Sequence, residues 1–230
     1  MIELPFRQNV LDHGWVELHS VMGNDLTIVN AARQSFGQTS TDMGEKEKGL
    51  INFLMRERHG TPFEMVVFTF NIKLPIFVMR EWVRHRIASI NEYSGRYSKM
   101  IEDYYFPKDS KIRSQTGKPG AYRFEPVGTF KAKAVQKFMA AVSSVCWNSY
   151  EILLKMGIAK EVARMILPVN FYTQITWTIN LRSLLNFINL RSADTAMWEI
   201  QEYSRAVEWI IHQQIPVTYD SFLKNKRVAP

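Results

Sequence analysis

Cysteine is almost absent from this chain. The only one among the 230 residues is Cys146, in the apolar run AAVSSVCW, so no disulfide can form within the chain. A lone thiol in such a run is typical of a buried structural residue rather than of a nucleophile. Because disulfides mark oxidising compartments, their exclusion favours a reducing one, and the sequence predicts a cytoplasmic protein.

Long apolar runs, a leader pattern and metal-binding spacings are also missing. No window reaches the roughly 18 apolar residues that a membrane span needs. The first residues, MIELPFRQNV, have no cationic start followed by an apolar run, which predicts no signal peptide. The histidines are scattered, without Cys/His or HExxH spacing, at His13, His19, His59, His85 and His212. We therefore expect neither a membrane span nor a metal site.

Negative charge is in short supply. Lysine and arginine number 29 against 22 for aspartate and glutamate, which gives a net charge of +7. Such an excess either serves solubility alone or attracts anions such as nucleotides, phosphorylated cofactors, nucleic acid or anionic membranes. Charge does not choose among them. The length of 230 residues, with 46% of them hydrophobic, is typical of one domain with a sizeable core.

Periodicity along the chain predicts a mixture of helices and strands. Runs rich in β-branched and aromatic residues predict strands at 15–22, 65–74 and 171–180. Apolar spacing and caps predict helices at 25–36, from about 50 to 58, from Pro75 to the RHR triplet at 84–86, and at 129–156, 161–168, 181–192 and 195–214. Loops are expected at 37–49, after the RHR triplet, and at 108–128, the last as a mobile surface segment. Since crossover units do not repeat, we expect an α+β fold with a small sheet, as a single domain over 1–230.

One stretch carries most of the chemistry: RHRIASINEYSGRYS, residues 84–98. Arginine supplies a planar fork of donors that stays charged and matches a phosphate. The Ser94-Gly95-Arg96 turn adds a hydroxyl, an approachable backbone and another fork, and its N–H groups can form an anion nest. His85 adds a group that titrates near neutral pH. The stretch is therefore a candidate site for two anionic groups, although a solvated basic helix end would also place cations there.

This stretch also resembles a known family. Arg84-His85-Arg86, followed after seven residues by Ser94, is similar to the RHR-x7-S signature of the flavin-dependent thymidylate synthases. Further blocks resemble the same family in the same order: AARQSF (31–36), HGTPFE (59–64), EVARMILP (161–168) and NLRSLLNFINLR (180–191). Together the matching blocks cover most of the chain outside 1–12 and 108–128.

The resemblance implies a reaction and its cofactors. Members of that family make dTMP from dUMP, with methylenetetrahydrofolate as the one-carbon donor, NADPH as the reductant and bound FAD as the hydride carrier. They work as homotetramers with sites where subunits meet, and need no enzyme nucleophile. Each ligand is anionic, so a net charge of +7 would help to attract them to the protein. The implied partners are these small molecules and other copies of the chain, with no nucleic acid and no membrane.

The resemblance also implies which residues bind each ligand. The dUMP set is Glu81, Arg84, Glu92, Ser94, Gly95, Arg96, Arg164 and Arg191. The FAD set is Ser35, His59, Thr61, Glu64, Arg84, His85, Arg86, Ile87, Asn180, Arg182 and Asn186. The implied catalytic residues are Arg191, a cation facing the uracil ring, and Ser94, which positions dUMP. Ser94 is not expected to be a nucleophile, because the sequence places no base beside it.

Two features of the residues themselves bear on these assignments. Arg182, Asn186 and Asn189 share one face of an otherwise apolar helix, and such a polar stripe either binds partners or faces water. Glu81 stands where the family usually has glutamine, and a carboxylate near a phosphate is unfavourable. Rather than turning toward a ribose hydroxyl, Glu81 is expected to pair with a basic neighbour, which could be Arg80, Arg84 or His85.

Two other functions remain compatible with the sequence. A flavoprotein of this fold that has lost methylation, with Glu81 as the lesion, would oxidise NADPH with oxygen and make no dTMP. A single-stranded nucleic-acid binder would use aromatic residues beside basic ones as stacking platforms. Against the binder, the sequence has no RRM, KH or zinc-finger signature and no run of basic residues.

Overall fold

The computed structural model describes residues 4–230, which divide into two compact units. The first unit runs to Tyr93 and resumes at Thr173–Pro230, and the second is Ser94–Tyr172. Helices and strands are mixed along the chain, so the predicted α+β class is confirmed. The assignment of the whole chain to one domain stays a prediction.

The elements of the first unit are, in chain order, β1 (Phe6–Val10), β2 (Gly14–Met22), α1 (Asp25–Arg33), η1 (Gln34–Phe36), α2 (Glu45–Arg56), α3 (Thr61–Glu64), β3 (Val67–Pro75), α4 (Ile76–Trp82), β4 (Ser89–Glu92), β7 (Tyr172–Asn180), α7 (Leu181–Arg191), α8 (Trp198–Gln214) and α9 (Pro216–Lys224). Those of the second unit are η2 (Asp109–Lys111), β5 (Arg113–Thr116), β6 (Arg123–Pro126), α5 (Thr129–Lys155), α6 (Lys160–Ala163) and η3 (Arg164–Ile166). The η elements are short 3-10 helices.

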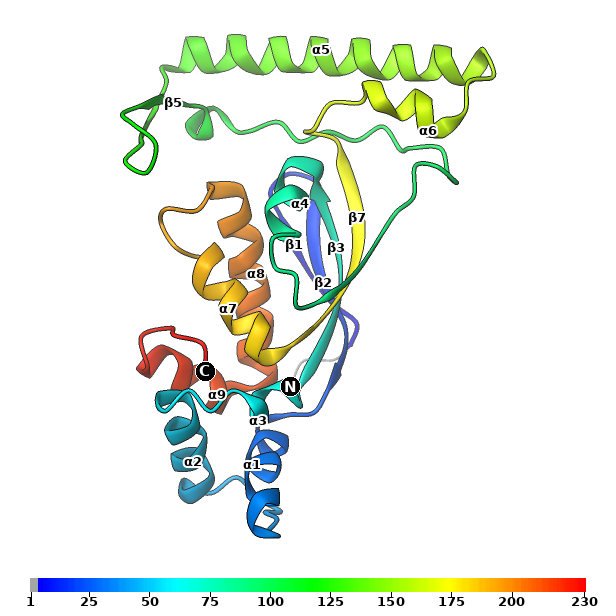
Figure 1. Ribbon diagram of the computed structural model, residues 1–230. Helices are drawn as coiled ribbons and strands as arrows, with labels where there is room; N and C mark the ends of the chain where they lie inside the picture. The colour runs from blue at the N-terminus through cyan, green and yellow to red at the C-terminus, as the bar shows by residue number, and fades with distance from the viewer. Residues whose placement is uncertain (1–3) are drawn as a thin grey trace. The chain divides into compact units, whose positions relative to one another are not determined.

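The first unit is built on a five-stranded sheet in the order β1-β2-β3-β7-β4. β1 pairs with β2, β2 with β3 and β4 with β7, each antiparallel. β3 alternates between buried apolar residues such as Phe68 and Phe70 and polar ones such as Thr69 and Asn71, as a strand with one covered face requires. α7 and α8 lie side by side, and α8 packs on β1 and β2 (Figure 1).

A cluster of large aromatic side chains fixes the point where the candidate site begins. The ring of Trp82, at the end of α4, lies 4.9 Å from that of Trp177 in β7 and 4.5 Å from that of Phe187 in α7. All three are fully buried, and burying a side chain of this kind stabilises a fold by about 1.5–3 kcal/mol. The backbone N–H of His85 donates to the Trp82 carbonyl at 3.1 Å. The RHR triplet therefore begins close to a residue that the core holds in place.

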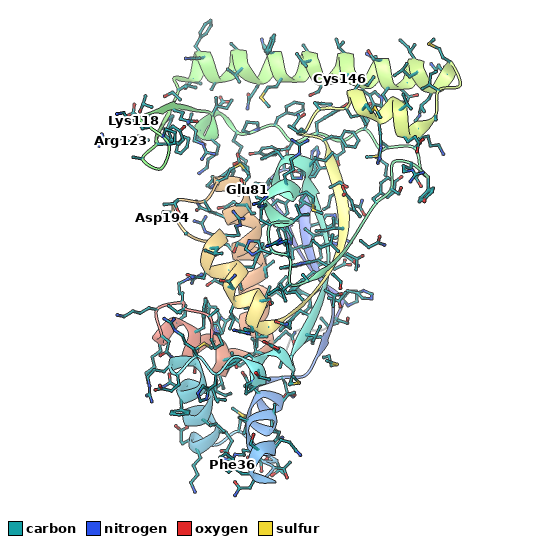
Figure 2. All side chains as sticks on the ribbon, viewed as in Figure 1. Phe36, Glu81, Lys118, Arg123, Cys146 and Asp194 are labelled. Atoms are coloured by element: carbon teal, nitrogen blue, oxygen red, sulfur yellow. The ribbon has the colours of Figure 1, made fainter. Side chains whose placement is uncertain are left out.

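The second unit is organised around α5, which is 27 residues long. Gly157 ends it with a φ of +78°, a conformation that favours glycine, and the Ile158 N–H donates back to the Leu153 carbonyl at 3.0 Å. The Tyr104 hydroxyl donates to the Ser143 carbonyl, and the Met100 N–H donates to the Tyr150 hydroxyl, so this helix also orders the segment that follows Ser94. Cys146 lies on α5 (Figure 2), half-buried rather than in the core.

Most of the predicted elements are confirmed. The strands at 15–22, 65–74 and 171–180 correspond to β2, β3 and β7. The helices at 25–36, 129–156, 161–168, 181–192 and 195–214 correspond to α1 with η1, α5, α6 with η3, α7 and α8. The predicted cap of α1 is also present, because Asn24 Oδ1 accepts from the Thr27 N–H at 3.1 Å.

Other predictions are wrong in ways that have local causes. The loop over 37–49 ends early, since α2 begins at Glu45 with a capping box in which Glu47 accepts from the Gly44 N–H. The RHR triplet lies beyond α4, and the loop expected after it contains β4, which pairs with β7. The segment 108–128 carries the β5–β6 hairpin, and its mobility stays a prediction.

β1 and α9 are among the elements that have no counterpart among the predicted ones. β1 is short and mostly polar, and it is a strand because it pairs with β2 along its whole length. α9 begins at Pro216 and is anchored by Asp25, whose carboxylate accepts from the Val217 and Thr218 N–H groups at 3.1 and 2.9 Å. We find no helix within residues 4–230 that is both long and apolar enough to cross a membrane.

Candidate functional site

A cleft of about 630 Å³ opens beside α7 in the first unit. Its walls come from segments that are far apart in the sequence: the end of α3, the turn after α4, the junction of β7 with α7, and the last residues of the chain. The lining residues are Glu64, Arg84, His85, Arg86, Ile87, Ile179, Asn180, Arg182, Ser183, Asn186, Leu190, Arg191, Ala229 and Pro230. Its polar side chains include four arginines and two asparagines.

The structure brings most of the predicted FAD set together in this cleft. The members that line it are Glu64, Arg84, His85, Arg86, Ile87, Asn180, Arg182 and Asn186. The remaining members, Ser35, His59 and Thr61, line a second hollow of about 960 Å³ that also includes residues of α1, α2 and α3. Phe36 contributes to this hollow with 79% of its surface exposed (Figure 2). Contact of these residues with FAD stays a prediction.

Arg182 lines both hollows and is held between them. Its Nη1 donates to Glu64 Oε1 at 2.8 Å, and its Nε donates to the Pro230 carbonyl at 2.9 Å. A Cβ at Gly60 would overlap the Arg182 guanidinium, so the glycine of the HGTPFE block makes room for it. The sequence gives no sign of this contact, since more than a hundred residues separate the partners.

The first turn of α7 combines a helix cap with the cleft wall. Asn180 Oδ1 accepts from the Ser183 N–H at 2.9 Å, which satisfies one of the free donors at the helix start. Of the predicted polar stripe, Arg182 and Asn186 line the cleft, and Asn189 is not among the lining residues. The opposite face of α7, including Leu184 and Phe187, is buried in the core. Two members of the stripe therefore face the cleft, as partners of a ligand would.

Glu81, His85 and Arg191 form a hydrogen-bonded cluster at the other end of α7. Arg191 Nη1 donates to Glu81 Oε2 at 3.0 Å, and Arg191 Nη2 donates to the Glu81 carbonyl at 3.0 Å. Arg191 Nε donates to His85 Nε2 at 2.9 Å. The His85 ring meets the Phe187 ring edge-on at 4.8 Å. Arg191 is thus fixed through three of its donors, and His85 lies against both a cation and an aromatic edge.

This cluster shifts the titration of its members. Burial, together with the neighbouring Arg191 charge, lowers the pKa of His85 from 6.5 to about 4. His85 is therefore neutral at physiological pH, as its acceptance of a hydrogen bond at Nε2 also requires. Burial raises the pKa of Glu81, and so does the charge of Glu199, while Arg191 acts against the rise.

The expected pairing of Glu81 with a basic neighbour at helical spacing is wrong. Its partner is Arg191, 110 residues further along the chain. Helical spacing points to Arg84 and His85, but α4 ends at Trp82, so the chain has left the helix before either residue. The binding of dUMP by Glu81 stays a prediction, and Glu81 is not among the residues that line the cleft.

Arg84 and Arg86 lie in the turn that follows α4, and both are exposed. No acidic side chain within residues 4–230 forms an ion pair with either of them. Their guanidinium groups line the cleft as donors that are available to a ligand. This arrangement suits an anionic group such as a phosphate.

Ser94, Gly95, Arg96 and Arg164 belong to the second unit, which brings these four dUMP residues together. The Arg96 N–H donates to Ser94 Oγ at 3.3 Å, and the Ser98 N–H donates to the Ser94 carbonyl at 3.0 Å, which closes the turn. A Cβ at Gly95 would lie 3.1 Å from Arg164 Cδ and 2.6 Å from Met100 Sδ. A side chain at this position would therefore have to displace the side chains of Met100 and Arg164.

The first turn of α6 fixes the side chain of Arg96. Arg96 Nε donates to Glu161 Oε2 at 2.8 Å, and Lys160 Nζ donates to the Tyr97 carbonyl at 2.8 Å. Glu161 was not singled out by the sequence, although it begins the EVARMILP block. The ion pair is about half exposed on both sides, so its net contribution to stability is about 0–1 kcal/mol. Its larger effect is to orient the guanidinium.

Glu92, the remaining member of the dUMP set, ends β4. Its Oε1 accepts from the Thr173 hydroxyl at 2.7 Å. It lines a shallow hollow of about 460 Å³ over the polar face of the sheet, together with Arg7, Asn71 and Thr176. The dUMP set is thus divided between the units, with Glu81, Arg84, Glu92 and Arg191 in the first.

Several residues of the cleft were missed by sequence reasoning. Ser183 and Leu190 lie in the NLRSLLNFINLR block, but neither carries a signal of its own. Ala229 and Pro230 are outside every matching block, and they reach the cleft because the chain turns back after α9. The segment after α9 is fixed to α8, because the Glu208 carboxylate accepts two hydrogen bonds from the Arg227 guanidinium at 2.6 and 2.9 Å.

Comparison with known proteins decides the family. The model of the Thy1 family, described as thymidylate synthase complementing protein, matches residues 17–217. This chain belongs to the Thy1 family. The resemblance drawn from the RHR-x7-S signature and its companion blocks is therefore confirmed.

Relatives within the Thy1 family are similar over nearly the whole chain. The chain is 46% identical over 215 residues to a flavin-dependent thymidylate synthase of Thermotoga neapolitana, which covers 94% of this chain and 93% of the relative. It is 41% identical over 221 residues to a flavin-dependent thymidylate synthase of Thermus thermophilus, which covers 96% of this chain and 80% of the relative.

Solved structures show the same fold. A UMP/dUMP methylase, PolB from Streptomyces cacaoi, bound with 5-Br UMP, superimposes with a TM-score of 0.88 at 35% identity, covering 96% of this chain and 98% of that one. The same protein bound with 5-Br dUMP gives a TM-score of 0.89 at 34% identity, with coverages of 97% and 100%. The arrangement of elements in this chain is thus that of PolB.

Proposed function

We propose that this chain is a flavin-dependent thymidylate synthase. It converts dUMP to dTMP, taking the one-carbon unit from methylenetetrahydrofolate and electrons from NADPH, with FAD as cofactor. Membership of the Thy1 family and the names of its relatives support the reaction. The structural observation that carries the proposal is the cleft beside α7, where Glu64, residues 84–87, Asn180, Arg182 and Asn186 meet from three separate parts of the sequence.

The residues of the two hollows fit FAD. Arg84 and Arg86 offer unpaired guanidinium donors, as a pyrophosphate requires, and the Asn186 amide offers both a donor and an acceptor to polar ring atoms. The second hollow adds apolar surface from Leu50, Phe53 and Phe36. When bound, the flavin supplies hydride transfer, and the protein supplies binding, orientation and charge. Arg182, which lines both hollows, would hold the middle of such an extended ligand.

Arg191 is the residue we assign to the uracil ring. It remains charged at any working pH, and the Glu81 and His85 contacts hold it in one orientation. A fixed cation beside the ring would stabilise negative charge that develops on the ring oxygens during substitution at C5. The ring loses its C5 hydrogen as a proton and gains the methylene carbon there. The bond from that carbon to the folate nitrogen breaks and tetrahydrofolate leaves, and a hydride that originates from NADPH completes the methyl group.

The second unit supplies the groups that we assign to the phosphate of dUMP. Ser94 Oγ, the backbone of Gly95, and the guanidinium groups of Arg96 and Arg164 lie around one turn. Ser94 positions the nucleotide and needs no base, which agrees with hydride chemistry carried by a cofactor rather than by a nucleophile. Glu81, Arg84 and Glu92 are the other members of the proposed dUMP set.

We also propose that the chain assembles as a homotetramer. One face of α5 supports self-association, because it exposes a row of apolar side chains at helical spacing: Phe130, Phe138, Val142, Val145, Ile152 and Met156, of which Phe130 is 91% exposed. Apolar patches of this kind mark protein interfaces more often than free surface. The cytoplasmic location stays a prediction of the sequence.

Product formation tests the proposed function. Purified protein should convert dUMP to dTMP, detected by mass spectrometry, only when FAD, NADPH and methylenetetrahydrofolate are all present under anaerobic conditions. Oxidation of NADPH by oxygen without dTMP would instead identify a flavoprotein that has lost methylation. Salt-sensitive binding of oligonucleotides without flavin binding would identify a nucleic-acid binder and overturn the proposal.

A further inference from the structure

Arg191 is held on two sides by protein groups. Its Nη1 and Nη2 donate to the carboxylate and carbonyl of Glu81, both at 3.0 Å, and its Nε donates to His85 Nε2 at 2.9 Å. A guanidinium has five N–H groups in a rigid plane, so these bonds leave one N–H on each Nη for a ligand. Glu81 and His85 fix the plane of the guanidinium, and this plane sets the direction in which the two remaining N–H groups point.

The contact with Arg191 also determines the state of His85. A guanidinium does not lose its proton in proteins, so Arg191 Nε can only donate and His85 Nε2 can only accept. A neutral imidazole that accepts at Nε2 carries its proton on Nδ1. Within residues 4–230 no side chain or backbone group is bonded to His85 Nδ1. His85 lines the cleft, where this N–H can reach a bound molecule.

Glu81 acts from behind Arg191 rather than from within the cleft. It lies on α4 (Figure 2), and it is not among the residues that line the cleft. The Glu81 side chain is 32% exposed and that of Arg191 is 19% exposed, so this pair is better shielded from water than an exposed pair such as Lys48 with Glu45. Because less water surrounds the two charges, their Coulomb attraction is stronger, and this holds the Arg191 guanidinium more firmly in one orientation.

We propose that Glu81 is a positioning residue that orients Arg191, and that Arg191 in turn keeps His85 neutral with its proton on Nδ1, as a hydrogen-bond donor to the cleft. A donor there suits a carbonyl oxygen or an unprotonated ring nitrogen of the bound flavin or pyrimidine. The assignment of that ligand rests on the proposed function. The tautomer of His85 is a property of the protein alone.

The charges around His85 agree with this state. Arg191 faces it from α7, Arg84 and Arg86 flank it in its own turn, and the Phe187 ring covers one edge. Glu81 on α4 and Glu199 on α8 supply the nearby negative charge, and Arg191 lies between Glu81 and His85. Burial and the Arg191 charge lower the pKa of His85 to about 4, so His85 is not an imidazolium at neutral pH.

Nuclear magnetic resonance of the apoprotein tests the tautomer without any ligand. In protein with ¹⁵N-labelled histidine, the long-range proton–nitrogen pattern distinguishes Nδ1–H from Nε2–H, and His85→Gln assigns the resonance. We expect the Nδ1–H pattern in wild type, and a mixture of tautomers in Glu81→Ala and Arg191→Gln. Glu45→Ala, which removes an exposed partner of Lys48, is the matched control and should keep the wild-type pattern. An Nε2–H pattern in wild type would overturn the proposal.

Steady-state kinetics test the positioning role. Displacing a catalytic group by about 1 Å can cost on the order of 100-fold, so Glu81→Ala should lower kcat for dTMP formation by about 10- to 100-fold. The affinities for FAD and dUMP should change much less, because every other residue of the two proposed binding sets remains. Glu81→Gln keeps an acceptor for Arg191 Nη1 and should recover part of the lost kcat together with the Nδ1–H pattern.

The two readouts separate this inference from the proposed function. If wild type made no dTMP but showed the Nδ1–H pattern, the function would fail and the inference about the protein would stand. If wild type made dTMP and Glu81→Ala kept both its kcat and its tautomer, the inference would fail and the function would stand. Should Glu81→Ala not fold, the wild-type tautomer and Glu81→Gln decide the matter.

Discussion

Asn180 shows how a single side chain in this chain serves both the fold and the site. Its Oδ1 caps α7 through the Ser183 N–H, and the same residue lines the cleft at the junction of β7 with α7. Replacing a cap of this kind by alanine costs about 0.5–2 kcal/mol. The loss would fall on the helix that carries Arg182, Asn186 and Arg191, so stability and ligand binding are coupled at this residue.

At the residue scale, the lowered pKa of His85 leads to a prediction of how the stability of the protein depends on pH. Its pKa is about 4 in the folded protein and 6.5 when unperturbed, so between these values the unfolded chain binds a proton that the folded one does not. The free energy of unfolding should therefore fall as the pH drops through this window, and His85→Gln should flatten the slope. Chemical denaturation from about pH 7 to pH 4 measures it.

Glu81 also affects how the free energy of unfolding depends on pH, but it acts in the opposite direction from His85. Its pKa is raised in the folded state, chiefly by burial, so the folded protein binds that proton more readily as the pH falls. This contribution is present in both wild type and His85→Gln, and the difference between them isolates the imidazole. Equal slopes in the two proteins would show that His85 titrates alike when folded and unfolded.

Arg96 predicts an effect on nucleotide affinity. A hydrogen bond to a charged group contributes on the order of 1.5–3 kcal/mol, so Arg96→Gln should weaken dUMP binding by about 10- to 100-fold. FAD binding should not change, because Arg96 lines neither the cleft nor the second hollow. Isothermal titration with dUMP measures the effect, and Lys48→Gln, another exposed member of an ion pair, is the control. Equal affinity for dUMP in both variants would exclude Arg96 from the phosphate site.

At the scale of elements, the contact between α3 and α7 depends on a glycine. Gly60→Ala would push its new methyl group against the Arg182 guanidinium, the far end of a flexible side chain. We expect the unfolding temperature to change little and the affinity for FAD to fall, measured by flavin fluorescence. Gly49→Ala in α2 is the matched control, because nothing lies near its Cβ position.

The control has an expected outcome of its own. An exposed helical glycine replaced by alanine stabilises a protein by about 0.5–1 kcal/mol, so Gly49→Ala should raise the unfolding temperature and leave FAD affinity unchanged. If Gly60→Ala also bound FAD with wild-type affinity, Arg182 would not be part of the flavin site.

Elements with strong local patterns were predictable from the sequence, and elements that depend on distant partners were not. β3 alternates apolar and polar residues, and α5 is a long helical pattern followed by Gly157, so both could be placed. β4 is four residues long, and it is a strand because β7, more than eighty residues away, pairs with it. α4 stops at Trp82, whose ring lies in the aromatic cluster, and the apolar spacing that continues to Ile87 does not reveal this end.

At the scale of the whole molecule, the exposed face of α5 predicts self-association. Phe138→Glu would place a charge in the apolar row and should shift the protein to smaller species in light scattering. Ser144→Glu adds the same charge at an exposed polar residue of the same helix and should leave the assembly intact. Identical masses for the two variants would remove α5 from the interface.

The candidate site could be predicted only in part, because its local motifs are visible in the sequence and its long-range contacts are not. The motif blocks identified the chain segments that meet in the cleft, because each block carries its residues in a fixed spacing. The pairings between blocks could not be derived: Arg191 binds Glu81 across 110 residues, and Arg182 binds Glu64 across 118. Such contacts depend on how α7 packs against the turn after α4 and against α3, and this is decided by the core.

The most direct test of the account is tritium release to water from dUMP labelled at C5, compared in wild type and Arg191→Ala under anaerobic conditions. We predict release by wild type that requires FAD, NADPH and methylenetetrahydrofolate, and a loss of release in Arg191→Ala of at least about 100-fold with flavin still bound. Wild type that binds and reduces flavin but releases no tritium, or Arg191→Ala that releases it at the wild-type rate, would contradict the account.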